Sequence, residues 1–481
     1  MIDKNELPPG WAIAKFEDLL DYIQPTEYIV ASTEYDDKYK TPVLTAGKSF
    51  IKGYTNETNG IFDALPVIIF DDFTTAIQFV NFPFKVKSSA MKILKPTSDL
   101  VNIKLAFYFM KTVHLKSETH KRYWISEYSK LPIPLPPLNE QKRIFDKIEE
   151  HFIILDKGIE SLKAAQEQLK IYRQSVLKWA FEGKLTDTWR KQQKDLPSAE
   201  QLHKQIESER IETCKLNNVK VKPTQSVSEK EMKELPELPK QMAWVMLGEI
   251  LWSVKDGPHY SPKYQEEGIP FISGGNIRPT GIDFKNAKFI SKELHEELSK
   301  RCKPEKWDVL YSKGGTTGIA RVNNYDIDFN VWVHVAVLKM IPSVNPFYLQ
   351  HALNSFHCYK QSQKYTHGVG NQDLGLTRMI LITLPFCSVK EQEKIVQEIE
   401  SRLSVCDKIE EAIEDSLLKA EALRLSIIKK GFEGKLVKQN PKDESAEILL
   451  AKIRAEIKKN SPEKPEKKVK IKTSKKKKEL A

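Results

Sequence analysis

The sequence predicts an α/β (mixed α+β) protein in which two globular blocks of twisted β-sheet with short helices are separated and followed by two long helices. Three observations lead to this fold class. A helix-like segment occurs twice at a constant offset, apolar residues inside it recur every seven positions, and the blocks before it carry β-branched runs broken by glycine turns. The two helices are expected to pack as an antiparallel coiled coil with pseudo-two-fold symmetry.

The repeat contains no gap. Glu140 at its start reappears as Glu391 and Phe181 near its end as Phe432, and 391 minus 140 and 432 minus 181 are both 251. The Phe-Glu-Gly-Lys-Leu sequence at 181–185 recurs at 432–436. A repeat of this length without insertions indicates one rigid element used twice.

Each copy carries an apolar seam of period seven, which is the pattern of helices that wind around each other. At 1.5 Å per residue, a helix over about 140–182 would span roughly 60 Å. One copy alone fits an ordinary amphipathic helix on any core, whereas two matched copies favour packing against each other. Either orientation is geometrically possible, and a pseudo-two-fold would make the helices antiparallel. The seam residues are Ile148, Leu155, Leu162, Leu169 and Val176 in the first copy and Ile399, Cys406, Ile413, Ala420 and Ile427 in the second.

The helix boundaries have local signals. A proline-rich stretch at 131–137 cannot be helical, and Asn139 is a plausible N-cap after it. In the second copy, Ser388 and Glu391 have capping-box spacing. Gly183 and Gly434 stand where left-handed C-terminal caps are expected.

The repeat extends into the blocks on either side. Trp11 matches Trp244, the segment 42–47 resembles 270–275, and 67–80 resembles 309–322. Downstream, Ser-Ala-Glu at 198–200 recurs at 445–447 and begins a short charged helix. Strands are predicted at 67–70 and 331–340, and short helices at 105–113 and 347–354.

The net charge of +11 is concentrated at one end. The segment 458–481 holds 11 lysines and 3 glutamates, a net charge of +8, so the rest of the chain carries +3. A lysine-rich tail is expected to be disordered and to add only salt-sensitive attraction to phosphates. Five scattered cysteines without a CxxC pair argue against a zinc ribbon or a disulfide framework. Without a secretory or long apolar segment, a soluble, cytoplasmic protein is expected.

Three enzyme motifs fail on inspection. The glycine-rich 313–318 lacks the Gly-Lys-Ser/Thr ending of a phosphate loop. Asn345-Pro346-Phe347-Tyr348 departs from the Asn/Asp-Pro-Pro-Tyr/Phe motif of amino-group DNA methyltransferases at its third position, and no glycine-rich cofactor motif accompanies it. Asp71-Asp72 lacks the further acid and lysine of a metal-dependent nuclease. No catalytic residue and no metal site is therefore predicted.

The doubled segment resembles a known family. The Pro-Pro-Leu-Asn-Glu-Gln at 136–141, the isoleucine-led helix and the Phe-Glu-Gly-Lys-Leu at 181–185 look like the first spacer of type I restriction–modification specificity subunits. The segment 384–436 resembles their C-terminal spacer, although its approach to the helix is two residues longer. The openings at Trp11 and Trp244 match the starts of the two target recognition domains of that family.

In the terms of that family the chain divides into seven parts. They are target recognition domain 1 (1–135), the central spacer helix (136–185), a charged linker with a short helix (186–236), target recognition domain 2 (237–386), the C-terminal spacer helix (387–437), a short helix (438–457) and the lysine-rich tail (458–481).

The resemblance implies a subunit that selects DNA sites without an active site of its own. Each recognition domain would read one half of a split, asymmetric double-stranded site, and the helices would set the gap and dock two methyltransferase subunits. Restriction subunits with ATP-driven translocation would join them. The cofactors S-adenosylmethionine, ATP and Mg²⁺ would bind those partners and none would bind this chain, and no membrane contact is implied.

Polar residues near predicted loops are the candidate DNA contacts. In the first domain they are Lys48, Tyr54, Asn56, Thr74, Gln78, His120 and Arg122, and in the second Asn276, Arg278, Lys313, Thr316, Arg321, Asn371 and Gln372.

Two alternatives also fit the residues. The first is a self-contained DNA methyltransferase or nuclease that uses the Asn345 or Asp71 region. The second is a structural coiled-coil adaptor without a DNA role, which the divergence of the two blocks on a duplicated scaffold argues against. The target bases and the gap length cannot be read from the sequence.

Overall fold

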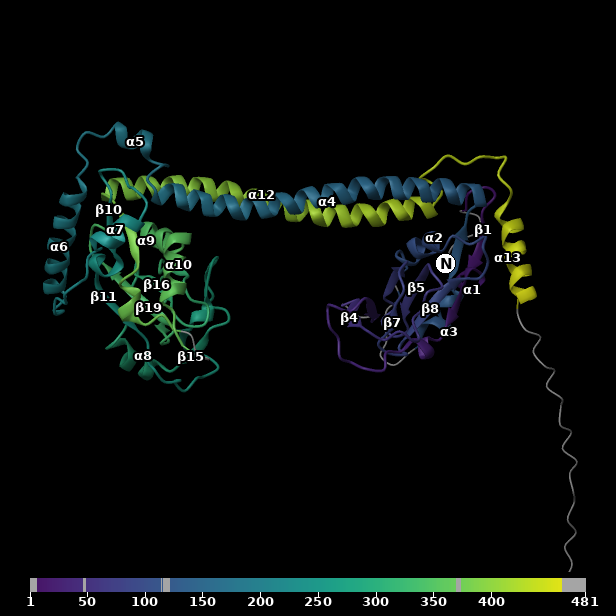
Figure 1. The fold of residues 1–481 in the computed structure, drawn as a ribbon, viewed down its shortest axis with the longest axis horizontal. Coiled ribbons are helices and arrows are strands. Elements are labelled where there is room, and N and C mark those ends of the chain that lie inside the picture. The colour runs from purple at the N-terminus through teal and green to yellow at the C-terminus, as the bar shows by residue number, and fades with distance from the viewer. Residues whose placement is uncertain (1–6, 46–48, 114, 116–121, 369–372, 461–481) are drawn as a thin grey trace, which may run out of the picture. The chain divides into compact units, whose positions relative to one another are not determined.

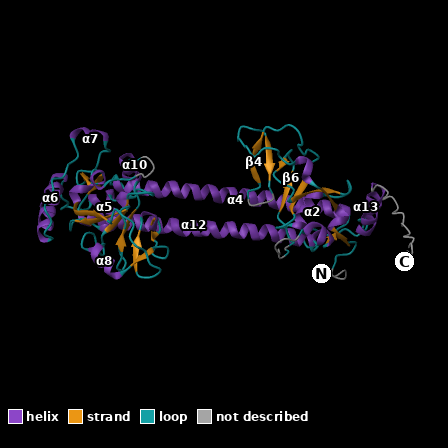
Figure 2. Ribbon diagram, turned by 90° about the horizontal axis from the view of Figure 1, so that it is seen from below, coloured by secondary structure: helices purple, strands orange, loops and turns teal. Residues whose placement is uncertain are grey.

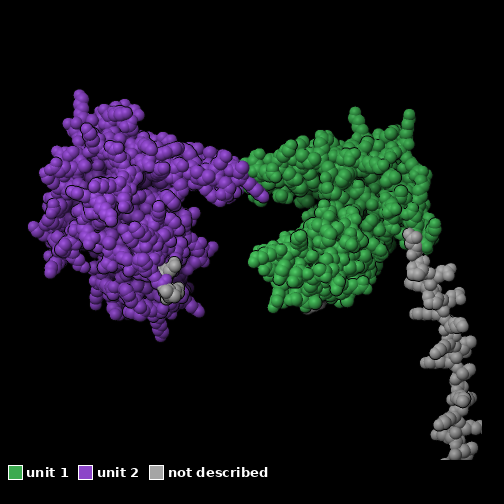
Figure 3. Space-filling view, in the orientation of Figure 1, with its two compact units in different colours: residues 1–162, 415–481 green, residues 163–414 purple. Residues whose placement is uncertain are grey.

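The computed structural model describes residues 7–45, 49–113, 115, 122–368 and 373–460. The chain forms two compact units (Figure 3): unit 1 comprises residues 1–162 and 415–481, and unit 2 comprises residues 163–414. Two long helices, α4 (Leu138–Phe181) and α12 (Val389–Phe432), each contribute to both units.

Unit 1 contains three small sheets (Figure 1). Strand β1 (Ala12–Lys15) pairs antiparallel with β9 (Pro132–Leu135). A four-stranded sheet has the order β2 (Leu20–Ile23), β8 (Met91–Pro96), β5 (Val67–Asp71), β6 (Ile77–Val80). A three-stranded sheet has the order β4 (Ile51–Thr55), β3 (Thr41–Leu44), β7 (Lys85–Val86). Its short helices are α1 (Phe16–Leu19), η2 (Pro25–Tyr28), α2 (Ile103–Met110), α3 (Tyr123–Ser126) and η3 (Tyr128–Lys130).

Unit 2 repeats these sheets strand for strand. Strand β10 (Ala243–Met246) pairs with β20 (Thr383–Phe386). The four-stranded order is β11 (Leu251–Asp256), β19 (Val335–Met340), β16 (Val309–Ser312), β17 (Ala320–Val322). The three-stranded order is β15 (Lys288–Ile290), β12 (Ile269–Ile272), β18 (Asn330–Val331). A further hairpin joins β13 (Ile277–Arg278) to β14 (Gly281–Ile282).

The helices of unit 2 lie around these sheets (Figure 2). They are α5 (Asp187–Lys191), α6 (Ala199–Leu216), α7 (Glu229–Glu234), η4 (Leu247–Ile250), η5 (Gly274–Asn276), α8 (Lys292–Ser299), α9 (Pro346–Leu353), α10 (Phe356–Tyr365) and α11 (Leu376–Met379). The predicted helices near 105 and 347 are confirmed as α2 and α9.

The predicted likeness of 67–80 to 309–322 is confirmed in the hairpin register. Val67 pairs with Val80 at the end of one hairpin, and Val309 pairs with Val322 at the end of the other. The prediction of one strand over 331–340 is wrong, since the chain turns at 332–334 between β18 and β19. There Val335 N–H donates to the Trp332 carbonyl at 2.9 Å, so local turn bonding interrupts the apolar run.

The long helices have the predicted seam and caps. Each spans 44 residues; six of the ten seam residues are buried (Ile148, Val176, Ile399, Cys406, Ile413 and Ile427) and the other four are half-buried (Leu155, Leu162, Leu169 and Ala420). Gly183 and Gly434 have φ of 71° and 69°. The N–H of the residue after each glycine donates back to a carbonyl five residues earlier, at 2.8 Å for Lys184 to Trp179 and 2.9 Å for Lys435 to Lys430. These bonds close both helices in Schellman motifs.

The helix starts agree only in part with the prediction. Ser388 caps α12, and its Oγ accepts the Glu391 N–H at 3.4 Å. Helix α4 begins at Leu138, so Asn139 lies inside the helix. The prediction that Asn139 is the N-cap is therefore wrong. The Pro137 carbonyl accepts the Gln141 N–H at 2.9 Å, and a residue whose carbonyl takes this first bond occupies the cap.

The two short charged helices pack across the repeat. Helix α6, which follows the first long helix, packs on β10, η4 and β11 of the second block. Helix α13 (Ala446–Asn460), which follows the second long helix, packs on α1 and β1 of the first block. Ala199 N–H donates to the Lys240 carbonyl at 3.1 Å, and Ala446 N–H donates to the Gly10 carbonyl at 2.8 Å. Each copy therefore ends on the block of the other copy.

The cysteines and the apolar segments complete the description. All five cysteine side chains are buried and unpaired. Burial raises the pKa of the Cys302 and Cys358 thiols to about 12, so both are protonated at neutral pH. Across the described ranges, no helix combines the length and the apolar character needed to cross a membrane.

Candidate nucleic-acid interface

In unit 1 the turn between β5 and β6 is bonded to the chain that leads into α3. Asp72 in this turn accepts the Trp124 N–H on Oδ1 at 2.9 Å, and its carbonyl oxygen accepts the Tyr123 N–H at 2.9 Å. Thr74 lies two residues after Asp72, and Arg122 directly precedes Tyr123, and both are exposed. The structure therefore brings these two predicted contact residues to the same end of the sheet.

A buried ion pair holds that turn. Asp72 and Lys92 are each 3% exposed, and the Lys92 Nζ lies 3.7 Å from the Asp72 carboxylate. Lys92 also donates to Gln24 Oε1 at 2.5 Å and lies 4.8 Å from the centre of the Tyr22 ring. A buried charge that loses its partner is strongly destabilising, so this pair fixes where the turn lies.

Unit 2 has a corresponding pair at the end of β16. Lys313 is 2% exposed, and its Nζ lies 2.8 Å from Asp373 and 3.4 Å from Asp256. The Lys313 carbonyl accepts the Leu374 N–H at 2.8 Å. Asp256 in turn contacts Arg301 at 3.1 Å. Lys313 thereby ties the turn after β16 to the segment that precedes α11.

The two units thus share a lysine–aspartate contact at this turn, with the two charges exchanged. In each, a lysine–aspartate contact holds the turn after an interior strand: in unit 1 it joins the turn to β8, while Asp72 also accepts the N–H groups at the start of α3, and in unit 2 it joins the turn to the segment before α11. The turn supplies the carboxylate in unit 1 (Asp72) and the ammonium in unit 2 (Lys313). The scaffold is repeated while the electrostatics at its loop-bearing end have diverged.

Two predicted contact residues have internal roles instead. Asn276 is 7% exposed, its Oδ1 accepts the Ser273 N–H at 3.0 Å, and its Nδ2 donates to the Asp283 carbonyl at 3.1 Å. Lys313 is buried in the ion pairs described above. Their polar atoms are used within the fold, so the structure does not support either as a base contact.

Three other predicted residues of unit 2 reach solvent: Arg278 and Thr316 are exposed and Arg321 is half-buried. Arg321 donates through Nε to the Arg278 carbonyl at 2.7 Å, which places the two arginines side by side. The Arg278 side chain is 54% exposed and lies 2.7 Å from Asp283. Burial lowers the pKa of Arg321 from its ordinary value. Thr316 is exposed in the turn between β16 and β17.

The remaining candidates are scattered or lie outside the described residues. Tyr54 on β4 and Gln78 on β6 are half-buried, and Asn56 is exposed just after β4. Lys48, His120, Asn371 and Gln372 lie outside the described residues. For all of these, DNA contact stays a prediction.

Sequence reasoning missed the residues that hold the loops. Lys92 had one usable signal, because a lysine inside the apolar run Met91–Leu94 needs a buried partner. Asp256 and Asp373 had none, since their partner Lys313 is about 60 residues away from each and only the fold joins them.

The rejected enzyme motifs have structural explanations. Asn345 caps α9, where its side chain accepts the N–H groups of Phe347 and Tyr348 and Pro346 fills the first turn. Asp71 accepts the Phe73 N–H at 2.8 Å within its own turn. Among the described residues, no group of three or more His, Cys, Asp or Glu side chains is placed to hold a metal ion.

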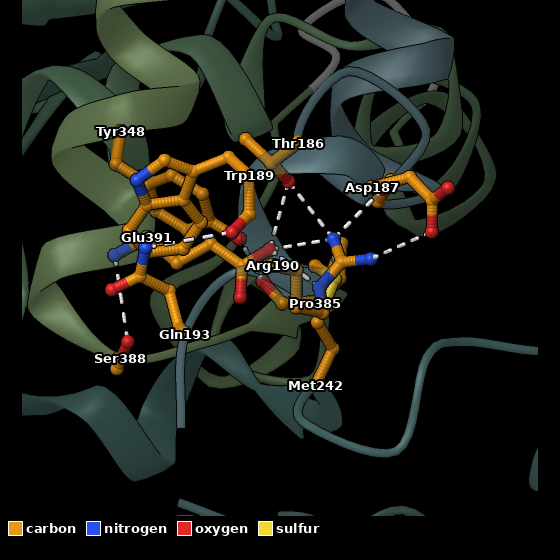
Figure 4. A network of polar contacts seen from close by, with 11 residues as sticks. Thr186, Asp187, Trp189, Arg190, Gln193, Met242, Tyr348, Pro385, Ser388 and Glu391 are labelled. Atoms are coloured by element: carbon orange, nitrogen blue, oxygen red, sulfur yellow. Dashed lines mark hydrogen bonds and ion pairs between the residues drawn. The ribbon is translucent and has the colours of Figure 1, made fainter. Parts of the chain in front are cut away.

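The start of α12 is locked to the end of α4 in unit 2 (Figure 4). Glu391 is fully buried and accepts from Arg190 Nη2 at 2.5 Å, from Arg190 Nε at 2.9 Å and from the Thr186 hydroxyl at 2.8 Å. Arg190 also donates to the Gly183 carbonyl at 2.8 Å, in the C-terminal cap of α4.

In unit 1 the repeated glutamate has a different partner. Glu140 accepts the indole N–H of Trp11 at 3.1 Å, and burial raises the pKa of this carboxyl although the Trp11 hydrogen bond and the Arg143 charge lower it. Arg143 itself binds Asp443 at 2.6 Å, in the segment between α12 and α13. Both units therefore fasten one long helix to the chain that follows the other, with different residues.

The outer faces of the helices carry apolar residues at equivalent positions. Ile154 is 61% exposed, and Val405, which is 251 residues later, is 54% exposed. Ile171, Leu418 and Leu423 are also exposed. Large apolar side chains that solvent reaches on a packed helix are typical of a protein–protein contact.

Comparison with known families identifies the repeated architecture. The family described as "Type I restriction modification DNA specificity domain" matches residues 8–169 and 239–419. The specificity subunit of the type I restriction enzyme EcoR124I/EcoR124II from Escherichia coli is 43% identical over 172 residues, which cover 33% of this chain and 43% of that protein. The EcoBI specificity subunit, also from Escherichia coli, is 28% identical over 335 residues, 67% of this chain and 64% of that one.

These matches span less than two thirds of the length of either relative. A solved chain from work on the complex assembly and conformational transition of the type I R-M system superposes with a TM-score of 0.55 at 16% identity. The superposition covers 89% of this chain and 99% of that chain, and it supports the fold.

Proposed function

The chain belongs to the type I restriction modification DNA specificity family, and from this membership we propose that it selects the DNA site for a complex whose chemistry is performed by other subunits. Each block reads one half of a bipartite, asymmetric duplex site. Methyltransferase subunits then modify adenine there, and restriction subunits cleave with ATP. The named relatives are specificity subunits of restriction enzymes, which supports a subunit without its own catalysis.

The observation that carries the proposal is the contrast between scaffold and loops. Both units keep the same strand order in both of their larger sheets. The turn-holding contact at the equivalent end has changed from Asp72–Lys92 to Lys313–Asp373. An enzyme duplicated for catalysis would be expected to keep its reactive groups, whereas two readers of different sequences need different loops on one frame.

The helices supply the spacing in this proposal. Half-sites one duplex turn apart lie on the same face of DNA with roughly 34 Å between centres, and a helix of 44 residues is about 66 Å long. The exposed apolar residues Ile154 and Val405, at positions related by the repeat, support the docking of two equivalent methyltransferase subunits.

Cofactor binding follows the same division of labour. We assign S-adenosylmethionine, ATP and Mg²⁺ to the partner subunits. The site residues offered for DNA are Thr74 and Arg122 in unit 1 and Arg278, Thr316 and Arg321 in unit 2, because the first four are exposed and the half-buried Arg321 bonds the Arg278 backbone.

A co-expression experiment tests the proposal. The chain is produced alone and together with the methyltransferase subunit encoded beside it, and adenine methylation is mapped across the host genome. Methylation at one split motif only in the co-expressing cells is expected. Methylation by the lone chain that Asn345→Ala abolishes would instead favour the self-contained methyltransferase.

A further inference from the structure

Unit 2 has an apolar groove between α4 and α10 that none of the roles above uses. It encloses about 680 Å³. One wall is the face of α4 that carries Ile171 and Lys178, and the other is the first turn of α10 with Phe356 and Lys360. Trp244 and Pro385, at the closing strand pair of the block, line it between the two walls. We call it the α4–α10 groove.

Its walls present apolar side chains to solvent. Ile171 is 68% exposed and Phe356 is 64% exposed, although both line the same groove. Trp244 and Phe181 lie deeper, at 7% and 5% exposure. Two large, facing and solvent-exposed apolar residues over a buried aromatic base form a pocket that an apolar side chain of a partner could fill.

The rim is positively charged. Lys170, Lys178 and Lys360 line the groove with one carboxylate, Glu182, although Lys170 is also paired with Glu167 at 2.7 Å and Lys178 lies 3.9 Å from Glu182. Lys184 lies 2.6 Å from Glu182 and compensates it. His357 adds no charge at neutral pH, because burial lowers its pKa. An occupant therefore needs an apolar centre with carboxylates at its edges.

One wall of the groove comes from a segment that is longer in the second copy. The chain between α9 (ending at Leu353) and α11 (starting at Leu376) has 22 residues, and the chain between α2 (ending at Met110) and α3 (starting at Tyr123) has 12. The difference of 10 residues equals the length of α10. The additional length, which α10 matches, therefore distinguishes the second block from the first on an otherwise repeated scaffold.

We propose that the α4–α10 groove docks an acidic, amphipathic segment of one methyltransferase subunit, so that the two copies of that subunit are held differently on this chain. The proposal rests on the proposed function for the identity of the partner. A protein segment fits better than DNA, because duplex DNA offers phosphates to the lysines but no apolar group for Ile171 and Phe356.

The test uses the full-length chain with the purified methyltransferase subunit as probe. Ile171→Asp and Phe356→Asp each place a carboxylate on one wall, and the triple variant Lys170→Glu, Lys178→Glu, Lys360→Glu reverses the rim. Ile327→Asp is the matched control, since Ile327 is 46% exposed in the same unit and does not line the groove. Circular dichroism and the Tm check that each variant is folded.

Binding of the methyltransferase subunit is measured by interferometry and DNA binding by fluorescence anisotropy. We expect both wall variants and the rim variant to weaken subunit binding about tenfold or more at one of the two sites, with the control and DNA affinity unchanged. If the wall variants bind the methyltransferase subunit as tightly as the control, the inference is overturned and the proposed function stands. The same holds if the rim variant loses DNA binding but keeps subunit binding. Absence of subunit binding by the unmodified chain overturns the proposed assembly and this inference with it.

Discussion

Arg173 on α4 donates to Asp407 on α12 at 2.6 Å within unit 2, and within unit 1 Arg424 on α12 pairs with Asp156 on α4. Adding 251 to 156 gives 407, and adding 251 to 173 gives 424. The same arginine and aspartate of the repeat thus meet in both units with the helices exchanged. This relationship requires antiparallel helices and confirms the predicted orientation.

The first prediction concerns that pair. Arg173→Asp sets an aspartate beside Asp407 and Glu410, and we expect the free energy of unfolding to fall by about 1 kcal/mol, because the pair is partly exposed and screened. Adding Asp407→Arg should recover part of the loss. Urea unfolding of the single and double variants measures the coupling. Lys147→Glu is the control, because it breaks an ion pair within α4, between Lys147 and Glu150. Asp407→Arg should not restore the stability that this variant loses.

The second prediction concerns the buried anchor of α12. Arg190→Met leaves the fully buried Glu391 without its cation, and we expect a loss of about 3–5 kcal/mol. Trp11→Phe removes only a neutral donor from Glu140 and should cost about 1–3 kcal/mol. Hydrogen exchange at the start of each helix separates the two effects. Equal losses would show that burial of the charge does not decide the stability of these anchors.

The third prediction concerns the loop-holding pair of unit 2. Lys313→Met removes the contact with Asp373 and frees the segment before α11. We therefore expect discrimination to relax in the second half of the DNA site and to stay unchanged in the first half. Asp72→Asn should do the converse through Lys92. Methylation motifs in cells that carry each variant with the partner subunits provide the measurement. Relaxation of both halves by either variant would contradict the modular assignment.

The fourth prediction is a pH dependence of unit 2. Burial and, to a smaller extent, the nearby Arg321 charge lower the pKa of His351 from 6.5 to about 4. Between these values the unfolded chain binds a proton that the folded chain excludes, so the free energy of unfolding falls as the pH falls from 6.5 to 4. His351→Gln should remove up to about 3 kcal/mol of this change. Unfolding of both proteins across this pH range is compared, and identical slopes would contradict the assignment.

Much of the frame could be predicted because its signals are local or repeated. The seam from Ile148 to Val176, the glycine caps at 183 and 434 and the paired hairpins 67–80 and 309–322 depend on periodicity and turn chemistry. The start of α4 was misplaced because the cap position is occupied by Pro137, which has no polar side chain to mark it in the sequence.

The candidate site was less predictable because its contacts are distant in sequence. Polar type alone did not separate the exposed Arg278 from the buried Lys313 and Asn276. Nor does any local pattern indicate that α13 packs on the first block through Arg454 and Asp18, 436 residues apart. Such contacts between distant residues form only in the folded tertiary structure.

The most direct test of the account exchanges one block. Residues 1–135, whose last strand β9 pairs with β1, are replaced by the first block of another specificity subunit, and adenine methylation is mapped with the partner subunits present. The account predicts that only the first half of the split motif changes, while the second half and the gap stay the same. A change in the second half, or loss of a bipartite motif altogether, would contradict it.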